Sequence, residues 1–318
     1  MPHPEPLYDV AQLGHVELLT PVLDDSVRFF TGVYGLDLVA TEGDCAYLRG
    51  WGDHDLTTLK LTSSANSGLG HVAWRAVSPQ ALERRVAALE ARGIEGTWTE
   101  GDIGHGKAFR FTAPGGHLTE LYYETEKYRP AGDKVPALPN QPQRFTGRGA
   151  AACRIDHINL LVPDVVTTRT FMDDTLGFKL REHLVPGSGQ GEVGAWMSLM
   201  NKAHDLALTR EPADTQGRLH HLAYAVENRE DVLRAADIFM EQDVFIEFGP
   251  AKHSRTQGFF LYVYEPGGNR MEIFSGGFHI FAPDWEPVTW NTEAGGRSTA
   301  WGLDVPASFH AHATPPLS

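Results

Sequence analysis

The sequence has little cysteine, little positive charge and no long hydrophobic run. Its two cysteines, Cys45 and Cys153, exclude a disulfide-rich scaffold, and neither lies in a Cys-x-x-Cys pair. Lysine and arginine number 27 against 41 aspartates and glutamates, which gives a net charge of −14. Such an acidic surface repels nucleic-acid phosphates and anionic lipids, so no nucleic-acid or membrane partner is expected. No segment has the length of a membrane-spanning helix or the pattern of a secretion signal, which favours a cytoplasmic protein.

What the sequence does have is histidine, at 15 copies, and a repeat. Four histidines, His15, His71, His157 and His221, each enter a short apolar segment typical of a strand. A helix-like stretch follows each segment, and further short apolar or alternating runs follow the helix. The predicted helices cover Asp24–Phe30, Ala81–Arg92, Val165–Thr175 and Val232–Gln242.

A stretch rich in proline and glycine divides the four segments into two pairs. This stretch, residues 127–150, has the composition of an inter-domain linker. The repeat predicts an α+β fold of four β-α-β-β-β modules, arranged as two tandem domains with curved, barrel-like mixed sheets. We expect residues 1–126 to form a non-catalytic pair of modules and residues 151–276 to form the catalytic domain. The aromatic-rich residues 277–318 are expected to form a tail that serves as a lid or an interface.

Two histidines and a glutamate recur at corresponding positions of each pair of modules. The second pair has His157, His221 and Glu272. Two imidazoles and one carboxylate can occupy one face of an octahedral metal ion and leave three positions open, which suits non-haem Fe(II) and oxygen chemistry. Alternation along the strand places His221 on one face with two small alanines, so we prefer it to His220 as the ligand. Spacing alone favours a metal site over a set of structural histidines.

Five segments of the C-terminal half carry a pattern shared with a known family: Asp156–Asn159, His204–Ala207, Leu219–Ala223, Phe260–Tyr264 and Pro266–Phe274. They resemble those of the type I extradiol catechol dioxygenases of the vicinal oxygen chelate superfamily. The resemblance is closest to catechol 2,3-dioxygenases and homoprotocatechuate 2,3-dioxygenases, and it extends from about Gln12 to Trp290. The resemblance implies two tandem vicinal-oxygen-chelate domains of the glyoxalase/dioxygenase kind. It implies extradiol (meta) cleavage of a catechol by O2 to a muconic-semialdehyde-type product, in a homo-oligomer (a tetramer or a dimer).

The same resemblance implies roles for individual residues. His157, His221 and Glu272 would bind Fe(II), or Mn(II) as in some relatives. His204 would be the acid–base residue beside the O2 site, and Tyr262 would hydrogen-bond the substrate oxygen. The surrounding residues implied to act on substrate or ligands are Asn159, Trp196 and His253.

The expected pocket wall is apolar. Phe248 occupies a strand edge where relatives that take a carboxylated side chain are expected to have arginine. An apolar wall penalises a carboxylate and favours hydrogen, alkyl or aryl substituents on the ring. Arg297 in the tail is the one cation that could reach in and weaken this inference.

Two other functions stay open at this level. A glyoxalase-like isomerase would generally have glutamates at two of the four module positions, which His157 and His221 do not match. A non-enzymatic ligand-binding or drug-sequestering module would not need these metal ligands together with His204. A cleaved, yellow semialdehyde product from catechol would favour the dioxygenase over both.

The N-terminal half repeats the ligand pattern in His15, His71 and Glu120, and His54 corresponds to His204 in the repeat. Its surroundings differ, because Arg110 lies ten residues before Glu120, where the C-terminal half has Tyr262 ten residues before Glu272. In addition, Glu17 stands in place of Asn159.

These differences predict that the N-terminal set holds no catalytic metal. We expect Arg110 or Arg75 to pair with Glu120 or Glu17 and to neutralise the carboxylate that a metal would need. The polar residues of this set are then expected to satisfy one another.

Overall fold

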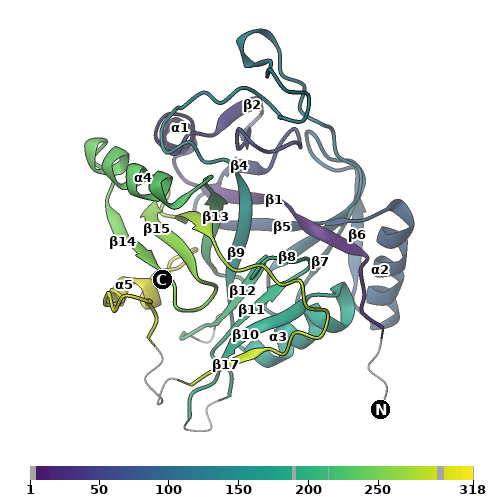
Figure 1. The fold of residues 1–318 in the computed structure, drawn as a ribbon. Helices are drawn as coiled ribbons and strands as arrows, with labels where there is room; N and C mark the ends of the chain where they lie inside the picture. The colour runs from purple at the N-terminus through teal and green to yellow at the C-terminus, as the bar shows by residue number, and fades with distance from the viewer. Residues whose placement is uncertain (1–4, 188–190, 214, 292–296, 318) are drawn as a thin grey trace.

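Four β-α-β-β-β modules follow one another along the chain (Figure 1). The computed structural model describes residues 5–187, 191–213, 215–291 and 297–317. The first module comprises β1 (Val10–Thr20), α1 (Leu23–Arg28), β2 (Asp37–Glu42), β3 (Cys45–Arg49) and β4 (Leu59–Ser63). The second comprises β5 (Gly68–Ala76), α2 (Pro79–Ala91), β6 (Gly96–Thr99), β7 (Ala108–Thr112) and β8 (Leu118–Tyr122).

The C-terminal half repeats this order and adds a tail. Its first module comprises β9 (Arg154–Val162), α3 (Val165–Phe171), β10 (Lys179–Leu184), β11 (Gly194–Ser198) and β12 (Leu206–Arg210). Its second comprises β13 (Leu219–Ala225), α4 (Arg229–Glu241), β14 (Ile246–Lys252), β15 (Gly258–Tyr264) and β16 (Arg270–Gly276). The tail contributes β17 (Val288–Trp290) and α5 (Ala307–Ala311).

Each half forms one mixed sheet in which the first strands of its two modules lie side by side. The strand orders are β2-β3-β4-β1-β5-β8-β7-β6 and β14-β15-β16-β13-β9-β12-β11-β10-β17. The central pairs β1/β5 and β9/β13 are antiparallel. Each pair of module-initial histidines therefore lies at the centre of its sheet, and the predicted fold class is confirmed.

The two longest helices, α2 and α4, begin at side-chain caps. Ser78 accepts a hydrogen bond from the Ala81 amide at the start of α2, and Asn228 accepts one from the Asp231 amide at the start of α4. The predicted ends of the other two helices are wrong in detail. α1 and α3 each pass into a π-helical turn, Phe29–Tyr34 and Met172–Leu176. A pattern of apolar residues does not distinguish these wider turns from a regular helix.

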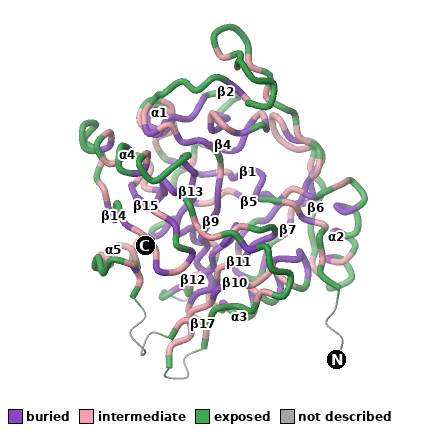
Figure 2. Tube along the Cα trace, in the orientation of Figure 1, coloured by how far each residue is buried: buried purple, intermediate pink, exposed green. Residues whose placement is uncertain are grey.

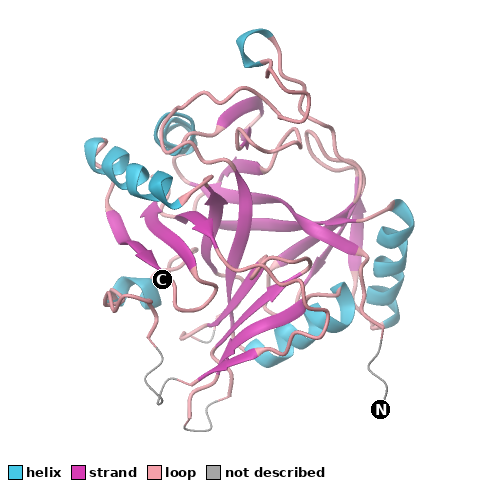
Figure 3. Ribbon diagram, in the orientation of Figure 1, coloured by secondary structure: helices cyan, strands magenta, loops and turns pink. Residues whose placement is uncertain are grey.

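One hydrophobic core runs through both halves. Phe29 stacks on Phe239 of α4 with ring centroids 6.5 Å apart, and Trp74 of β5 meets Phe178 edge to face at 4.8 Å. The first module therefore packs on the fourth and the second on the third. Figure 2 shows the buried residues concentrated on the strands, and Figure 3 shows the helices at the outside of the sheets.

The linker and the tail both lie against the rest of the chain. Gln143, buried in the linker, accepts a hydrogen bond from Arg49 at 2.7 Å and donates one to Asp37 at 2.8 Å. In the tail, β17 pairs in parallel with β10, and α5 packs near β14. Among the described residues, we find no helix that is both long and apolar enough to cross a membrane.

Candidate metal centre

Three buried side chains from three strands converge in the C-terminal sheet. His157 lies on β9, His221 on β13 and Glu272 on β16. The two histidine Nε2 atoms are 3.4 Å apart, and Glu272 Oε2 is 2.9 Å from His157 Nε2 and 3.1 Å from His221 Nε2. Two ligands about 2.1 Å from one ion and at right angles to each other are roughly 3.0 Å apart. The three donor atoms thus have the spacing of neighbouring ligands of a single metal ion, and these residues fit the ion that the sequence implies.

Each of these two histidines follows a bulged residue. The register between β9 and β13 shifts twice, and the shifts leave Asp156 and His220 outside the paired positions. A bulge re-aims the side chain of the extra residue. Asp156 Oδ1 lies 2.8 Å from His157 Nδ1, and His220 Nδ1 lies 2.7 Å from His221 Nδ1. Strict alternation placed His220 on the opposite face, whereas it is buried and lines the same cavity as His221.

Neighbouring charges set the protonation states of the three residues. Burial lowers the pKa of His157, but the charges of Glu272 and Asp156 outweigh it and raise that pKa to about 9. Burial lowers the pKa of His221 to about 4. Burial raises the pKa of Glu272, yet the two histidines hold it well below its usual range. The carboxylate is therefore ionised and His221 is neutral near pH 7, as metal ligands must be.

His204 and Asn159 lie on the His157 side of the centre. The His204 ring is buried against that of His157, with centroids 4.0 Å apart. Burial and the positive charge of His157 lower the pKa of His204 well below its usual value, so this imidazole is neutral near pH 7. Asn159 Oδ1 accepts a hydrogen bond from the Thr209 hydroxyl at 3.0 Å.

Tyr262 and His253 lie on the Glu272 side. The Tyr262 hydroxyl is 3.2 Å from His253 Nε2, which is itself 3.3 Å from Glu272 Oε1. Burial and the Glu272 charge raise the pKa of Tyr262 well above its usual value. The phenol therefore keeps its proton and acts as a hydrogen-bond donor.

A cavity of about 710 Å³ opens in front of this centre. Of the site residues predicted from the sequence, all but Glu272 line this cavity. The lining ones are His157, Asn159, Trp196, His204, His221, Phe248, His253 and Tyr262. Phe248 packs edge to face on Phe309 at 5.2 Å and gives the apolar wall that we expected. Arg297 is exposed and is not among the lining residues.

Two arginines that the sequence reasoning missed do line the cavity, Arg210 and Arg255. The Arg255 guanidinium lies 5.0 Å from the centre of the Trp196 ring, and the nearby Glu182 charge opposes the effect of burial on its pKa. The cavity wall is therefore apolar at Phe248 and cationic at the Trp196 side.

The tail covers part of the same cavity. Val305, Phe309 and His310 line it, and the Phe309 ring lies 4.9 Å from that of Tyr262. The Phe309 carbonyl is 2.9 Å from His220 Nε2, across 89 residues of sequence. The sequence around Phe309 does not predict that it lines the cavity, because contacts with residues far away in the chain place it there.

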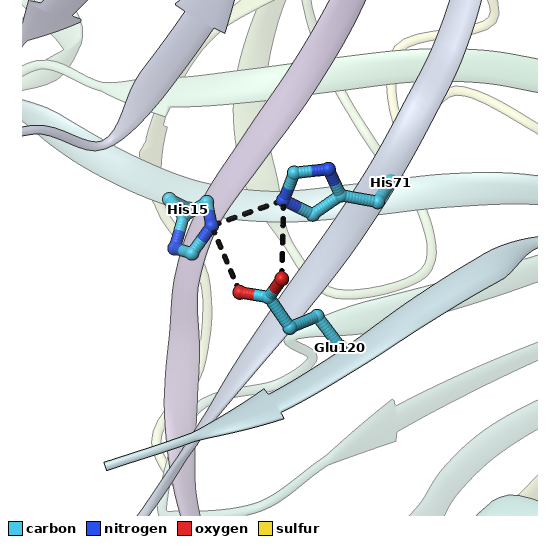
Figure 4. A group of neighbouring side chains, drawn as sticks. All are labelled: His15, His71 and Glu120. Carbon is cyan, nitrogen blue, oxygen red and sulfur yellow. Dashed lines mark hydrogen bonds and ion pairs between the residues drawn. The ribbon is translucent and has the colours of Figure 1, made fainter. Parts of the chain in front are cut away.

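The N-terminal set converges as well (Figure 4). His15 Nε2 is 3.1 Å from His71 Nε2 and 3.3 Å from Glu120 Oε1. Arg110 Nε donates to Glu120 Oε2 at 2.6 Å, so the expected pairing of Arg110 is present. Arg75, the alternative cation, donates to the Tyr123 carbonyl and lies 3.7 Å from Asp55 Oδ1.

Two expectations about the N-terminal set are wrong. His54 is exposed, and the imidazole that stacks on His15, with centroids 3.8 Å apart, belongs to His105. The polar groups do not all satisfy one another, since His15 Nδ1 and both ring nitrogens of buried His105 have no hydrogen-bond partner in the part of the chain that the structure describes. Position in the repeat misassigned His54, because the loop that follows β3 takes a different path from the one that follows β11.

Comparison with known proteins places the chain in a family. Residues 12–121 and 154–273 both match the Glyoxalase/Bleomycin resistance protein/Dioxygenase superfamily. A metapyrocatechase from Geobacillus stearothermophilus is 45% identical over 98% of this chain and 95% of its own length. A manganese-dependent 2,3-dihydroxybiphenyl 1,2-dioxygenase from Geobacillus genomosp. 3 is 42% identical over 89% of this chain and 90% of its own.

A solved structure agrees with these relatives. The homoprotocatechuate 2,3-dioxygenase of Arthrobacter globiformis superposes with a TM-score of 0.86 at 26% identity, over 99% of this chain and 95% of that one. The family match covers both sheets, and the buried pair of histidines with a glutamate lies in the C-terminal one. The chain therefore belongs to the glyoxalase/bleomycin resistance protein/dioxygenase superfamily and, within it, to the type I extradiol dioxygenases.

Proposed function

We propose that the protein cleaves the ring of a catechol with O2, on the extradiol side of the two hydroxyls, with one Fe(II) ion held by His157, His221 and Glu272. The observation that supports this most directly is the convergence of two imidazole nitrogens and one carboxylate oxygen at the inner end of a large cavity. When bound, the ion supplies neighbouring positions for the catechol oxygens and O2 and a route for electrons between them.

His204 is the proton carrier of this proposal. Its imidazole is neutral and buried, and it packs directly on the ligand His157. A neutral imidazole nitrogen accepts the proton that a catechol hydroxyl loses on binding, and the imidazolium then returns it to oxygen later in the reaction. His157 is held by Asp156 and is therefore not available for this role.

Tyr262 and His253 orient the substrate from the opposite side. The phenol of Tyr262 donates a hydrogen bond to a substrate oxygen, and its raised pKa keeps the proton on the tyrosine. His253 lies between the Tyr262 hydroxyl and Glu272 Oε1, so it fixes the position of both. Asn159, Trp196 and Phe248 complete the wall that receives the ring.

The preferred ring substituent is uncharged in this proposal. Phe248 lies among Phe260, Tyr262 and Phe309, and a carboxylate beside these rings would lose its hydration without gaining a partner. Arg255 lies over the Trp196 and Trp290 rings in another part of the wall, so this preference applies to a substituent that faces Phe248. Catechol and alkyl- or aryl-substituted catechols are therefore the substrates to try first.

Manganese is the second candidate ion. One relative at 42% identity is named for its manganese dependence, and two imidazoles with a carboxylate accept either ion. Protein stripped of metal and reloaded separately with Fe(II) or Mn(II) decides between them, with turnover measured at equal metal content.

The activity test uses Fe(II)-loaded protein, catechol and air. A yellow ring-opened product is expected, and with labelled O2 its mass contains both oxygen atoms. His157→Ala should abolish the colour, and the exposed His54→Ala should leave it unchanged. Unchanged catechol after incubation with fully loaded protein would contradict the proposal and favour a binding module. A rearranged product without added oxygen would favour an isomerase.

A further inference from the structure

We propose that His15, His71 and Glu120 form a second divalent-metal site in the N-terminal sheet, which is structural and takes no part in ring cleavage. The donor atoms resemble those of the catalytic centre in kind and in spacing. The His15 and His71 Nε2 atoms are 3.1 Å apart, and Glu120 places Oε1 3.3 Å from His15 Nε2 and Oε2 3.9 Å from His71 Nε2. All three side chains are buried and point toward one another from β1, β5 and β8 (Figure 4).

Irregularities in strand register precede the histidines of this site, as they do at the catalytic centre. The register between β1 and β5 shifts around Gly14 and Gly70, the residues directly before His15 and His71. Gly70 leaves room for Glu17, because a Cβ at residue 70 would lie 2.5 Å from the Glu17 carboxylate. Glu17 Oε2 fills that room and lies 2.8 Å from His71 Nδ1. Such a carboxylate holds the proton on Nδ1 and directs the Nε2 lone pair of His71 toward the site.

The charge around the site favours a cation. Glu120, Glu17 and Asp102 supply three carboxylates, against the two cations Lys60 and Arg110. The pairing of Arg110 with Glu120, which we expected to neutralise the carboxylate, occupies only Oε2. Arg110 also bonds Asp102, so its charge is shared between two acids, and Glu120 Oε1 stays directed at His15 and free of Arg110. A metal-bound carboxylate commonly accepts such a hydrogen bond at its other oxygen.

Buried nitrogens without partners point to missing polar neighbours. His105 stacks on His15, and among the described residues its two ring nitrogens and His15 Nδ1 have no hydrogen-bond partner. Leaving such groups unsatisfied in a protein interior is costly. Water molecules that complete the coordination of an ion at the triad would supply partners for the His105 nitrogens.

The ion expected here differs in role from the catalytic one. The large cavity is lined by residues from His157 to His310, and none of the N-terminal triad borders it. Two imidazoles and a carboxylate suit Zn²⁺ or Co²⁺ as well as Fe²⁺, with Zn²⁺ bound more tightly than Fe²⁺ or Mn²⁺. Because Arg110 lies against Glu120, binding is expected to be weaker than at the catalytic centre, where Tyr262 takes the corresponding place.

The test counts metal in stripped full-length protein reloaded with Zn²⁺ and desalted. Wild type should retain two ions per chain, and His157→Ala and His71→Ala one each. The control His54→Ala changes an exposed histidine and should retain two. Co²⁺ loading of His157→Ala should also give the visible absorption of histidine-bound cobalt, a readout that does not depend on activity.

The catalytic-site variant keeps the proposal falsifiable even where His71→Ala fails to fold, since it leaves the N-terminal set intact. One retained ion and a raised melting temperature on adding Zn²⁺ to His157→Ala, or to Glu272→Gln, support the second site. No retained ion in these two variants, with one in wild type, would overturn it. Either result leaves the ring-cleavage test unaffected, because that test is read at the other metal.

Discussion

At the scale of single residues, how well a histidine can bind metal through Nε2 depends on the group that hydrogen-bonds its Nδ1. Asp156 bonds His157 and His220 bonds His221, each through Nδ1, and both arrangements direct Nε2 toward the centre. In the N-terminal set Glu17 bonds His71 Nδ1 in the same way, while His15 Nδ1 has no partner within the described ranges. Such contacts fix the tautomer and raise the basicity of the ligand nitrogen.

Asp156→Asn should therefore weaken metal binding at the catalytic centre by about 10- to 100-fold, because an amide is a poorer acceptor for the His157 proton than a carboxylate. Competition with a chromophoric chelator measures the loss. Asp164→Asn is the matched control, since Asp164 is an exposed helix cap and asparagine caps equally well. Equal affinities in the two variants would contradict the role of Asp156.

His204→Phe should lower turnover by about 10²-fold or more, because phenylalanine keeps the packing on His157 and cannot take a proton. Metal content and the dissociation constant for catechol should stay near wild type. The measurement is kcat at saturating catechol and O2 with metal content determined in parallel. A wild-type kcat would exclude His204 as the proton carrier.

Metal uptake should release a proton. The pKa of His157 is raised to about 9, so in the absence of an ion this residue is protonated near pH 7, while His221 with its pKa of about 4 is neutral. Binding should then displace about one proton per catalytic ion, and metal affinity should fall as pH falls below about 9. Without metal, the stability of the fold depends on pH in the opposite direction from metal affinity. A raised histidine pKa stabilises the fold below the unfolded value, and this contribution is lost as pH rises through about 9.

Calorimetry of metal binding in two buffers of different ionisation enthalpy counts the protons. The titration uses Glu120→Gln protein, so that only the catalytic centre takes up the ion. Heats that do not depend on the buffer would contradict the charge assigned to His157.

At the scale of elements, the paired central strands and their bulges place the chemistry. The two sheets use the same device, a register shift directly before each ligand histidine, but with different residues. Asp156 and His220 occupy the bulges in the C-terminal half, and Gly14 and Gly70 occupy them in the N-terminal half. The halves therefore share a scaffold and differ in the groups that support the ligands.

Gly70→Ala should break the contact between Glu17 and His71, because the new methyl group would overlap the Glu17 carboxylate. The expected cost is about 1–3 kcal/mol of unfolding free energy, the usual effect of losing a charged hydrogen bond. Gly32→Ala is the control, since no described atom beyond its chain neighbours and its own helix backbone lies within 4 Å of the added carbon. Urea unfolding compares the two, and equal midpoints would show that Glu17 moves without penalty.

At the scale of the whole molecule, the N-terminal half supports the catalytic centre across the shared core. Tyr34, in the π-helical turn after α1, donates a hydrogen bond of 2.7 Å to the backbone carbonyl of Glu272. Its ring meets Tyr224 edge to face at 6.0 Å. The N-terminal half thus anchors β16, the strand that carries Glu272. In this way it supports the centre although it does not border the cavity.

Tyr34→Phe should lower the unfolding free energy by about 1 kcal/mol, because the hydroxyl and its buried acceptor lose their bond while the ring packing stays. Chemical denaturation at constant m-value measures it. Tyr8→Phe serves as the control, since Tyr8 is 68% exposed. A variant with the same midpoint as this control would show that the contact adds nothing to stability.

The sequence by itself determined the fold class and the two recurring sets of two histidines and a glutamate. Both follow from a repeat of short strands, in which a histidine or glutamate keeps its place relative to the strand and its turn. Alternation along the strand was enough to select His221 over His220, because its partner strands carry His157 and Glu272 to the same side.

Only the tertiary structure decided what surrounds these ligands. Bulges shift alternation by one residue, so Asp156 and His220 face the site against the simple pattern. His105 takes the place expected for His54, and Phe309 reaches the cavity from the tail. Such neighbours are set by loop paths and by contacts between residues far apart in the chain, and the energies that hold them do not follow any local period of the sequence.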